Sequence, residues 1–290
     1  MALKSLEELA NTAAASGDPF WCVVLKEDIK ERQVTKEESF AKMEGMYLAM
    51  KEADKQYDGK LRSRSGLSGG DGQRLSEYLE KGESLCGDFI TTVMMRAVKM
   101  GESNACMKRI VAAPTAGSCG VLPAVLVTME ERFGFSIEQM TQALYVAAGI
   151  GEVIAERAFI SGAQGGCQAE IGSASAMAAG AAVFLYGGTT QQILHACAMA
   201  LKNLLGLTCD PVAGLVEIPC IKRNILGAVN ALTSADVALA GVKSAIPPDE
   251  VIDTMRSIGS MLPKALRETG EGGLAISPEG LKIMEKQQKE

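Results

Sequence analysis

Ile171-Gly-Ser-Ala-Ser-Ala-Met-Ala-Ala-Gly-Ala-Ala-Val-Phe-Leu-Tyr186 is the apolar stretch around which this 290-residue chain must fold. Its 16 residues are too few for a helix that crosses a bilayer, which needs about 20 residues. Its small Gly, Ala and Ser side chains allow neighbouring helices to approach closely. The wider apolar region, residues 143–185, is interrupted by polar side chains at Glu152, Glu156, Arg157, Gln164, Gln168 and Glu170. We therefore predict a helix buried inside a helical protein, and no membrane span.

The rest of the chain also shows the signals of an all-α protein. Hydrophobic residues make up 47% of it and aromatic residues only 4%, so the core must consist of Ala, Leu, Ile, Val and 15 Met. The polar and apolar residues show little strand-like alternation. Two capping boxes, Thr35-Lys-Glu-Glu38 and Ser136-Ile-Glu-Gln139, predict helix starts. Further helices are predicted over residues 73–81, 88–101, 173–186, 189–205, 221–242 and 249–258. We expect one domain over residues 1–290, with the N-terminal helices of residues 1–57 at its periphery.

Charge and cysteine usage exclude several classes of partner. The net charge of −6 at pH 7 leaves no basic stripe that could neutralise phosphates, so we expect no nucleic acid. Residues 3–9 begin an amphipathic helix and not the apolar run of a secretion signal, so we expect a cytoplasmic protein. The eight cysteines of such a chain indicate reduced thiols, metal ligands or core residues instead of disulfides.

Two turns rich in glycine and hydroxyl groups are candidates for binding an anion. The first is Ser63-Arg-Ser-Gly-Leu-Ser-Gly-Gly-Asp-Gly72, whose hydroxyls and amides can surround a small anion. The second, Pro114-Thr-Ala-Gly-Ser-Cys-Gly120, precedes an apolar helical run, as anion sites at helix N-termini do. A tight turn with a hydroxyl cap is an equally good interpretation of the second. Its Cys119 could approach a metal cluster, contact a substrate or pack in the core.

Three cysteines lie at breaks in the helical pattern, where a thiolate can be presented without a helix in the way. Cys167 ends a glycine-rich turn, Cys209 precedes Asp210-Pro211, and Cys220 follows Pro219. Their gaps of 42 and 11 residues are too uneven for a zinc finger or a CxxC pair. Thiolates favour zinc or iron–sulfur, so a soft-metal site and a core role remain equally open for these three. We assign a core role to Cys22, Cys86, Cys106 and Cys197.

His195 is the only histidine, and it lies in an apolar helical pattern that is typical of a core histidine. A Ser–His–Asp hydrolase or a multi-histidine metal enzyme would depend on this single imidazole, and we predict neither. Lys222-Arg-Asn224 follows Cys220 directly. Its two cations could balance a cluster or hold a carboxylate, or they could form a solvated helix start.

Four of these segments, in this order, resemble the iron–sulfur-dependent L-serine dehydratases, and most closely the separate alpha chain of the two-subunit form. The resemblance covers nearly the whole chain, to about residue 285. It is carried by Ser65-Gly-Leu-Ser-Gly-Gly-Asp71, Ala113-Pro-Thr-Ala-Gly-Ser118, Gly162-Ala-Gln-Gly-Gly-Cys-Gln-Ala-Glu-Ile-Gly-Ser173 and Cys209-Asp-Pro-Val-Ala-Gly-Leu-Val-Glu-Ile-Pro-Cys220.

The resemblance implies an all-helical catalytic domain that converts L-serine to pyruvate and ammonia. It implies a 4Fe–4S cluster, in a site formed by loops, with Cys167, Cys209 and Cys220 as ligands. The single-chain relatives carry an additional N-terminal domain, so a separate beta chain is the implied partner. The substrate carboxylate is expected at the second turn, with the first turn and the cations nearby; the expected contacts are Thr115, Ala116, Gly117, Ser118, Ser63, Ser65, Lys222 and Arg223.

The resemblance leaves two roles open. The base that takes the α-proton is unassigned, with His195 or a group of the partner chain as candidates. Some single-chain relatives end in a cysteine that reaches the fourth iron, whereas this chain ends in Glu285-Lys-Gln-Gln-Lys-Glu290. Cys119 is a candidate for that iron.

Other functions remain possible at this stage. A lyase for L-threonine or L-cysteine would differ only in pocket shape. A non-catalytic iron–sulfur carrier or a structural subunit would leave the two hydroxyl-rich turns unused. A pyridoxal phosphate enzyme usually needs an α/β scaffold, whose strand pattern is missing from the sequence.

Overall fold

The computed structural model describes residues 4–289, so residue 3 of the expected N-terminal helix and residue 290 of the tail lie outside the described part. Within it the chain is all-α, as predicted, and its only β-type pairing is an isolated bridge between Cys209 and Arg267. The helices are α1 Leu6–Ser16, α2 Phe20–Arg32, α3 Lys36–Lys55, α4 Asp71–Glu80, α5 Gly87–Ala105, α6 Val121–Phe133, α7 Ile137–Arg157, α8 Gly162–Gly165, α9 Ser173–Leu185, α10 Thr190–Lys202, α11 Cys220–Leu239, α12 Pro248–Met261 and α13 Pro278–Lys289. Short turns lie between them: η1 Ala116–Ser118, the π-turn η2 Gln168–Gly172, η3 Val212–Gly214, η4 Lys264–Leu266 and η5 Gly273–Ile276.

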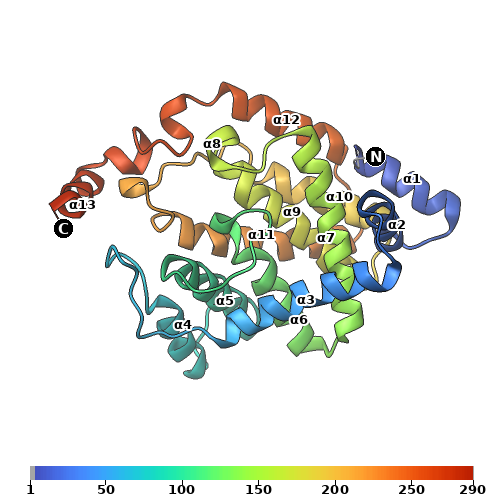
Figure 1. Cartoon of the computed structure of the whole chain (residues 1–290), viewed down its shortest axis with the longest axis horizontal. Coiled ribbons are helices and arrows are strands. Elements are labelled where there is room, and N and C mark those ends of the chain that lie inside the picture. The colour runs from blue at the N-terminus through green and yellow to red at the C-terminus, as the bar shows by residue number, and fades with distance from the viewer. Residues whose placement is uncertain (1–3, 290) are drawn as a thin grey trace.

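The opening apolar stretch forms α9, which lies in the centre of the molecule and is buried along its whole length except at Phe184. The helices α6, α7, α10 and α11 pack around it (Figure 1). Glycines allow this close packing: a Cβ on Gly180 of α9 would come within 2.3 Å of Ile150 Cδ1. The buried helix predicted from the sequence is confirmed. No helix of residues 4–289 has the length and apolar character to span a membrane.

A polar contact that the sequence did not predict joins α9 to α11. Ser175 Oγ donates to Gly227 O over 2.8 Å, and Asn230 Nδ2 donates to Ser175 Oγ over 2.9 Å. All three groups are buried, so each hydrogen bond compensates the loss of solvent at its partners. This contact fixes the position of α11, whose first residue is Cys220, relative to the centre.

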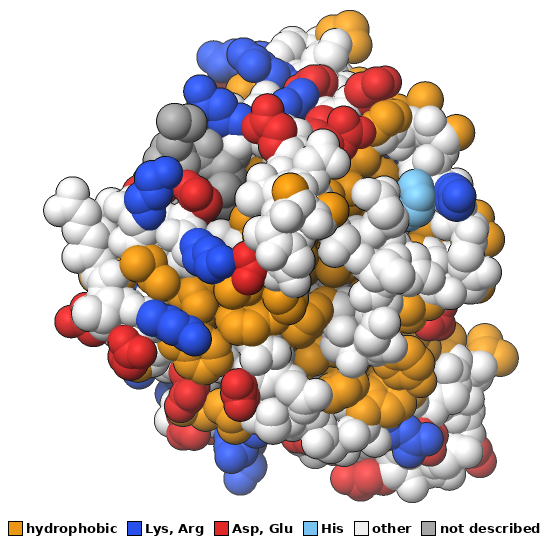
Figure 2. Space-filling view, turned by 90° about the vertical axis from the view of Figure 1, so that its right-hand side faces the viewer, with side chains coloured by type: hydrophobic (Ala, Val, Ile, Leu, Met, Phe, Trp, Pro, Cys, Tyr) orange, Lys and Arg blue, Asp and Glu red, His pale blue; other side chains and the backbone are white. Residues whose placement is uncertain are grey.

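The N-terminal helices contribute more to the core than the expected peripheral position implied. Leu6 of α1, Phe20 of α2 and Tyr47 of α3 are buried in the same hydrophobic cluster as α9, and that cluster extends to Met255. Apolar side chains also gather on the surface of the side where α1 and α2 lie (Figure 2). The inner faces of these helices therefore belong to the core of the molecule.

Helix ends differ from the prediction where distant residues cap them. Both predicted capping boxes are present, with Thr35 and Ser136 as N-caps. The helix expected from residue 73 begins at Asp71, because the Glu102 carboxylate of α5 accepts the N–H groups of Asp71 (2.8 Å) and Gly72 (3.1 Å). The C-terminal helix α13 was not predicted.

Candidate functional site

The structure brings the three cysteines of the helical breaks toward one region. Cys167 directly precedes the π-turn η2, and Cys220 is the first residue of α11. Cys209 lies in an extended segment, where its N–H donates to Leu266 O (2.9 Å) and its carbonyl accepts from Glu268 N (2.7 Å). All three thiols are buried. Three segments distant in sequence therefore meet at buried sulfur atoms.

Electrostatics link these thiols. The nearby Cys209 side chain, together with the Arg223 guanidinium, lowers the pKa of the Cys167 thiol. Burial, together with the nearby Cys167, raises the pKa of Cys220 to about 12. A cation beside Cys167 favours one thiolate at this position. The described residues contain no group of three or more His, Cys, Asp or Glu side chains that could hold a metal ion as they stand.

The second hydroxyl-rich turn lies against the same region through Glu170. Thr115 Oγ1 donates to Glu170 Oε1 over 2.7 Å, and a Cβ on Gly117 would lie 3.1 Å from that oxygen. Asn224 holds the turn from the other side: its amide donates to Gly117 O (2.9 Å) and Cys220 O (3.0 Å) and accepts from Gly120 N (2.8 Å). The turn is thereby fixed relative to Cys220.

Glu170 is a buried carboxyl between this turn and the cysteines. A Cβ on Gly162 would lie 2.7 Å from Cys209 Sγ, 3.0 Å from Glu170 Oε2 and 3.2 Å from Glu268 Oε2. Burial raises the pKa of Glu170, and the Glu268 carboxylate adds to this effect. A thiol and two carboxyl groups therefore pack so closely against the backbone of residue 162 that only glycine fits there.

The first hydroxyl-rich turn is attached to the cysteine motif 209–220. Ser63 Oγ and Ser65 Oγ donate to the two oxygens of the buried Glu217, each over 2.7 Å. Both hydroxyls expected to contact a substrate are therefore engaged by a carboxylate of the chain itself. This contact joins segments 150 residues apart and holds the turn beside the cysteine motif.

The two cations after Cys220 also have partners in the chain. Lys222 forms an ion pair with Asp71, and Arg223 donates to Asp210 Oδ1 (2.8 Å) and to Thr208 O (2.6 Å). Lys222 is exposed, whereas Arg223 is largely buried next to Cys167. Of the two, Arg223 is the one that the structure brings to the cysteines.

Two sequence candidates lie elsewhere. His195 Nδ1 accepts from Ser244 N (3.3 Å) in a separate pocket that it shares with Leu194 and Pro247. Cys119 Sγ contacts Met100 O (3.7 Å) in a small apolar cluster with Ala53, and burial raises its pKa to about 12. Neither side chain is brought together with the three cysteines.

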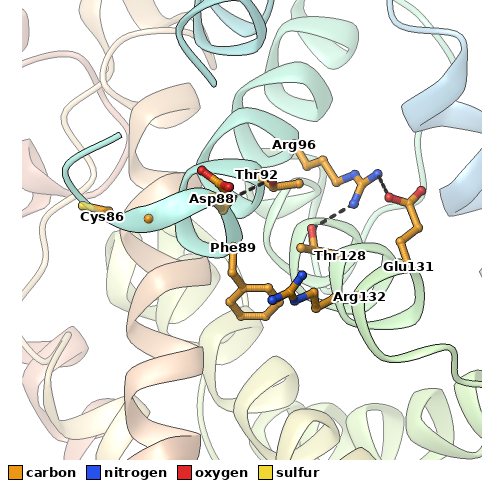
Figure 3. A pocket seen from close by; sticks show the side chains of 9 residues that line it. Cys86, Asp88, Phe89, Thr92, Arg96, Thr128, Glu131 and Arg132 are labelled. Carbon is orange, nitrogen blue, oxygen red and sulfur yellow. Dashed lines mark hydrogen bonds and ion pairs between the residues drawn. The ribbon is translucent and has the colours of Figure 1, made fainter. Parts of the chain in front are cut away.

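A pocket of about 460 Å³ opens between α5 and α6, away from these motifs (Figure 3). Its buried Arg96 is already bonded to Asp54 (3.1 Å), Thr128 (3.0 Å) and Glu131 (2.5 Å). None of the residues expected to form the site lines it. Pocket size therefore does not identify the site in this fold.

Sequence reasoning missed three residues of the candidate site: Glu170, Glu217 and Asn224. Glu170 was noted only as an interruption of the apolar region, and Asn224 only as the residue after the two cations that follow Cys220. All three lie inside or next to the quoted motifs, so the motifs themselves were the available signal.

The fold and the site define an all-α protein in which buried thiols and carboxyl groups meet two hydroxyl-rich turns. Comparisons with known proteins identify the group to which it belongs. The family described as "Serine dehydratase alpha chain" matches residues 16–275. The chain therefore belongs to the serine dehydratase alpha chain family.

Individual relatives agree with this assignment. The chain is 48% identical over 264 residues to the "Probable L-serine dehydratase, alpha chain" of Bacillus subtilis (strain 168), covering 91% of this chain and 88% of that one. It is 44% identical over 282 residues to the "L-serine dehydratase, alpha chain" of Peptoniphilus asaccharolyticus, covering 97% of both. A match to the "L-serine dehydratase" of Helicobacter pylori (strain ATCC 700392 / 26695) is 43% identical and covers 64% of this chain but 42% of that protein.

Proposed function

We propose that this chain is the catalytic alpha chain of an L-serine ammonia-lyase, which converts L-serine to pyruvate and ammonia. The observation that carries the proposal is the meeting of all four motifs. Glu217 attaches the first turn to the cysteine motif, and Glu170 attaches the second turn to the motif around Cys167. Relatives that match along nearly their whole length are named for this activity.

We propose a 4Fe–4S cluster as the cofactor, with Cys167, Cys209 and Cys220 as its ligands. The donor set supports it, since buried thiols are soft ligands of the type that iron–sulfur clusters use. Cys209 Sγ packs directly against the backbone of Gly162, where a Cβ would lie only 2.7 Å from it, so the glycine is what lets this thiol take its position. When bound, such a cluster would supply a Lewis-acidic iron that makes the substrate hydroxyl a better leaving group.

The chain's own residues would bind and orient the substrate. We propose that the turn of Thr115, Ala116, Gly117 and Ser118 holds the substrate carboxylate. A capping box satisfies the N–H groups of Thr115 and Ser118, which leaves those of Ala116 and Gly117, at the start of the helical turn, for a ligand. Asn224 and Arg223 hold this turn and Cys167 in place. Ser63 and Ser65, fixed by Glu217, would close the site from the other side. The base that takes the α-proton is unassigned, since His195 lies in a separate pocket.

A separate beta chain is the proposed partner, and the cytoplasm is the proposed location. Two similar relatives are named as alpha chains, and the chain matches only 42% of the length of the Helicobacter protein, whose name carries no chain designation. The part of the Helicobacter protein that this chain does not match would correspond to a separate beta chain.

The test combines iron and sulfide analysis of protein purified without oxygen with a serine-dependent pyruvate assay, with and without the beta chain. Cys209→Ala should lose the cluster absorbance and the activity together, whereas Cys22→Ala at a half-buried cysteine should keep both. A cluster without pyruvate formation would indicate a carrier. Activity in metal-free protein, abolished by hydroxylamine, would indicate pyridoxal phosphate. L-Threonine and L-cysteine, assayed in parallel, would define the preferred substrate.

A further inference from the structure

Glu170 is a buried carboxyl without a cation partner. Glu170 is only 8% exposed, and its carboxyl group accepts a hydrogen bond from Thr115 Oγ1. No lysine, arginine or histidine of residues 4–289 forms an ion pair with it. By contrast, Asp210 pairs with Arg223, and Glu217, which also lacks a cation, accepts a serine hydroxyl at each of its two oxygens.

A second carboxylate adds to the charge at this point. Glu268 Oε2 lies, like Glu170 Oε2, against the position of a Cβ on Gly162, at 3.2 Å and 3.0 Å. Two carboxyl groups that converge on one point of the backbone, with no ion pair between either of them and a cation of residues 4–289, favour a positively charged ligand beside them.

The proposed substrate has one charged group without a partner. On the function proposed above, the turn of residues 115–118 takes the carboxylate of the amino acid, and the cysteine side takes the hydroxyl. The α-ammonium is attached to the carbon between them. Glu170 lies in the matching place, since one oxygen contacts Thr115 of the turn and the other lies, like Cys209 Sγ, against the backbone of Gly162.

We propose that Glu170 binds the α-ammonium group of the substrate and thereby selects amino acids over hydroxy acids. The π-turn places it for this role. Cys167 directly precedes the turn and Glu170 lies within it, so one local distortion sets both side chains. Such π-turns within helices occur frequently at functional sites. This inference rests on the proposed function for the placement of the carboxylate and the hydroxyl.

The test uses the holoenzyme, with its cluster and partner chain, and two ligands that lack the β-hydroxyl that the proposed reaction removes. L-Alanine and L-lactate differ only in an ammonium in place of a hydroxyl. Their Kd values are measured by calorimetry without serine, so the readout is binding and not turnover. Glu170→Gln should raise the Kd for L-alanine at least about tenfold, as expected when a buried charge pair loses one partner. It should change the Kd for L-lactate by less than about twofold.

Two further variants make the result specific. Glu170→Asp keeps the charge and should keep the preference for L-alanine over L-lactate. Glu156→Gln, at an exposed acid of α7, should change neither Kd. Iron content and Tm of each variant show whether it is folded and loaded.

The proposal is overturned if Glu170→Gln raises the Kd of both ligands equally or leaves both Kd values unchanged. It is also overturned if Glu170→Asp changes the two Kd values in the same way as Glu170→Gln. The KM for L-serine should follow the L-alanine result. If the wild-type enzyme prefers L-alanine but makes no pyruvate from L-serine, the proposed reaction fails while the ammonium site stands.

Discussion

Asn224 shows how a single side chain can determine the relation between two motifs. Its amide donates to Gly117 O and Cys220 O, and its oxygen accepts from Gly120 N. The side chain is 1% exposed, so water cannot replace a lost partner. Because it contacts backbone atoms on both sides, it acts by positioning the turn and the cysteine relative to each other.

Asn224→Asp should therefore impair the enzyme without a change of side-chain size. The substitution removes the amide donor and places a carboxylate against two carbonyl oxygens, at a cost of about 1–3 kcal/mol for the buried polar groups. We expect a lower Tm and a kcat/KM for L-serine that falls at least about tenfold. Asn11→Asp at an exposed position is the control. An unchanged Tm together with an unchanged KM would contradict the positioning role.

His195 gives the opposite expectation for activity. Because it lies in a separate pocket with Ser244, His195→Gln should keep kcat within about twofold of wild type. A large loss of kcat with an intact cluster would return His195 to the candidates for the base.

His195 should also affect how stability depends on pH. Burial, together with Lys243 and Lys202, lowers the pKa of His195 below its ordinary value of 6.5. Just below pH 6.5 the unfolded chain then binds more protons than the folded one, so the free energy of unfolding decreases as the pH falls. His195→Gln should remove that contribution. Chemical denaturation of both proteins between pH 5 and 8 measures the difference.

For single residues, the sequence predicted which residue types could form a site better than it predicted which of them lie close together. The turns and cysteines were recognisable because Gly, Pro and Cys have narrow uses. Glu170 was not recognisable, since a glutamate in a helical pattern has the same local signature whether it faces solvent or a thiol. Only packing across 55 residues, from Thr115 to Glu170, identifies it.

The helices themselves were predictable where their periodicity is local. The buried α9 and both capping boxes follow from short segments of sequence. The π-turn before α9 does not, because distant atoms hold it: Gln168 Nε2 donates to Met255 O (3.1 Å), and Gln168 Oε1 accepts from Gly206 N (2.9 Å). The C-terminal α13 was missed because lysine, glutamate and glutamine dominate it.

The packing of α11 on the π-turn η2 and on α6 depends on Gly227. A Cβ there would lie 2.8 Å from Ile171 Cγ2 and 2.9 Å from Val121 Cγ2. Gly227→Ala should lower the free energy of unfolding by about 1–3 kcal/mol through overpacking, although alanine favours helices.

Gly45→Ala is the matched control, because Gly45 also lies within a helix but a Cβ there meets nothing within 4 Å. That change should stabilise the chain by about 0.5–1 kcal/mol. Urea denaturation of both variants compares the two effects. Equal effects would show that helix propensity, and not contact with Ile171 and Val121, governs the stability effect at position 227.

On the scale of the whole molecule, the site depends on contacts between remote segments. The first turn is hydrogen-bonded to Glu217 of the cysteine motif 209–220. It is also hydrogen-bonded to the C-terminal helix α13, where Gln287 Nε2 donates to Ser65 O over 2.7 Å. These contacts could not be predicted from local patterns. The family resemblance gave the order of the motifs along the chain, but it did not predict which of them contact each other.

Gln287→Ala should loosen the first turn. Loss of a hydrogen bond worth about 1 kcal/mol should speed hydrogen exchange of the amides in residues 63–70 roughly fivefold. Gln288→Ala, at the exposed neighbouring position, should not change it. Equal exchange in both variants would indicate that Glu217 alone holds the turn.

The π-turn has a consequence for insertions and deletions. Residues 168–172 run without a break into α9, which is locked in the core, and Cys167 directly precedes them. Removing one residue would convert the π-turn to α-helix and rotate Cys167 by about 100° around the helix axis. A substitution changes one side chain, whereas an insertion or deletion of one residue changes the direction of every side chain in the turn before α9. We therefore expect alignment gaps between functional homologues to avoid this segment even where its residues vary.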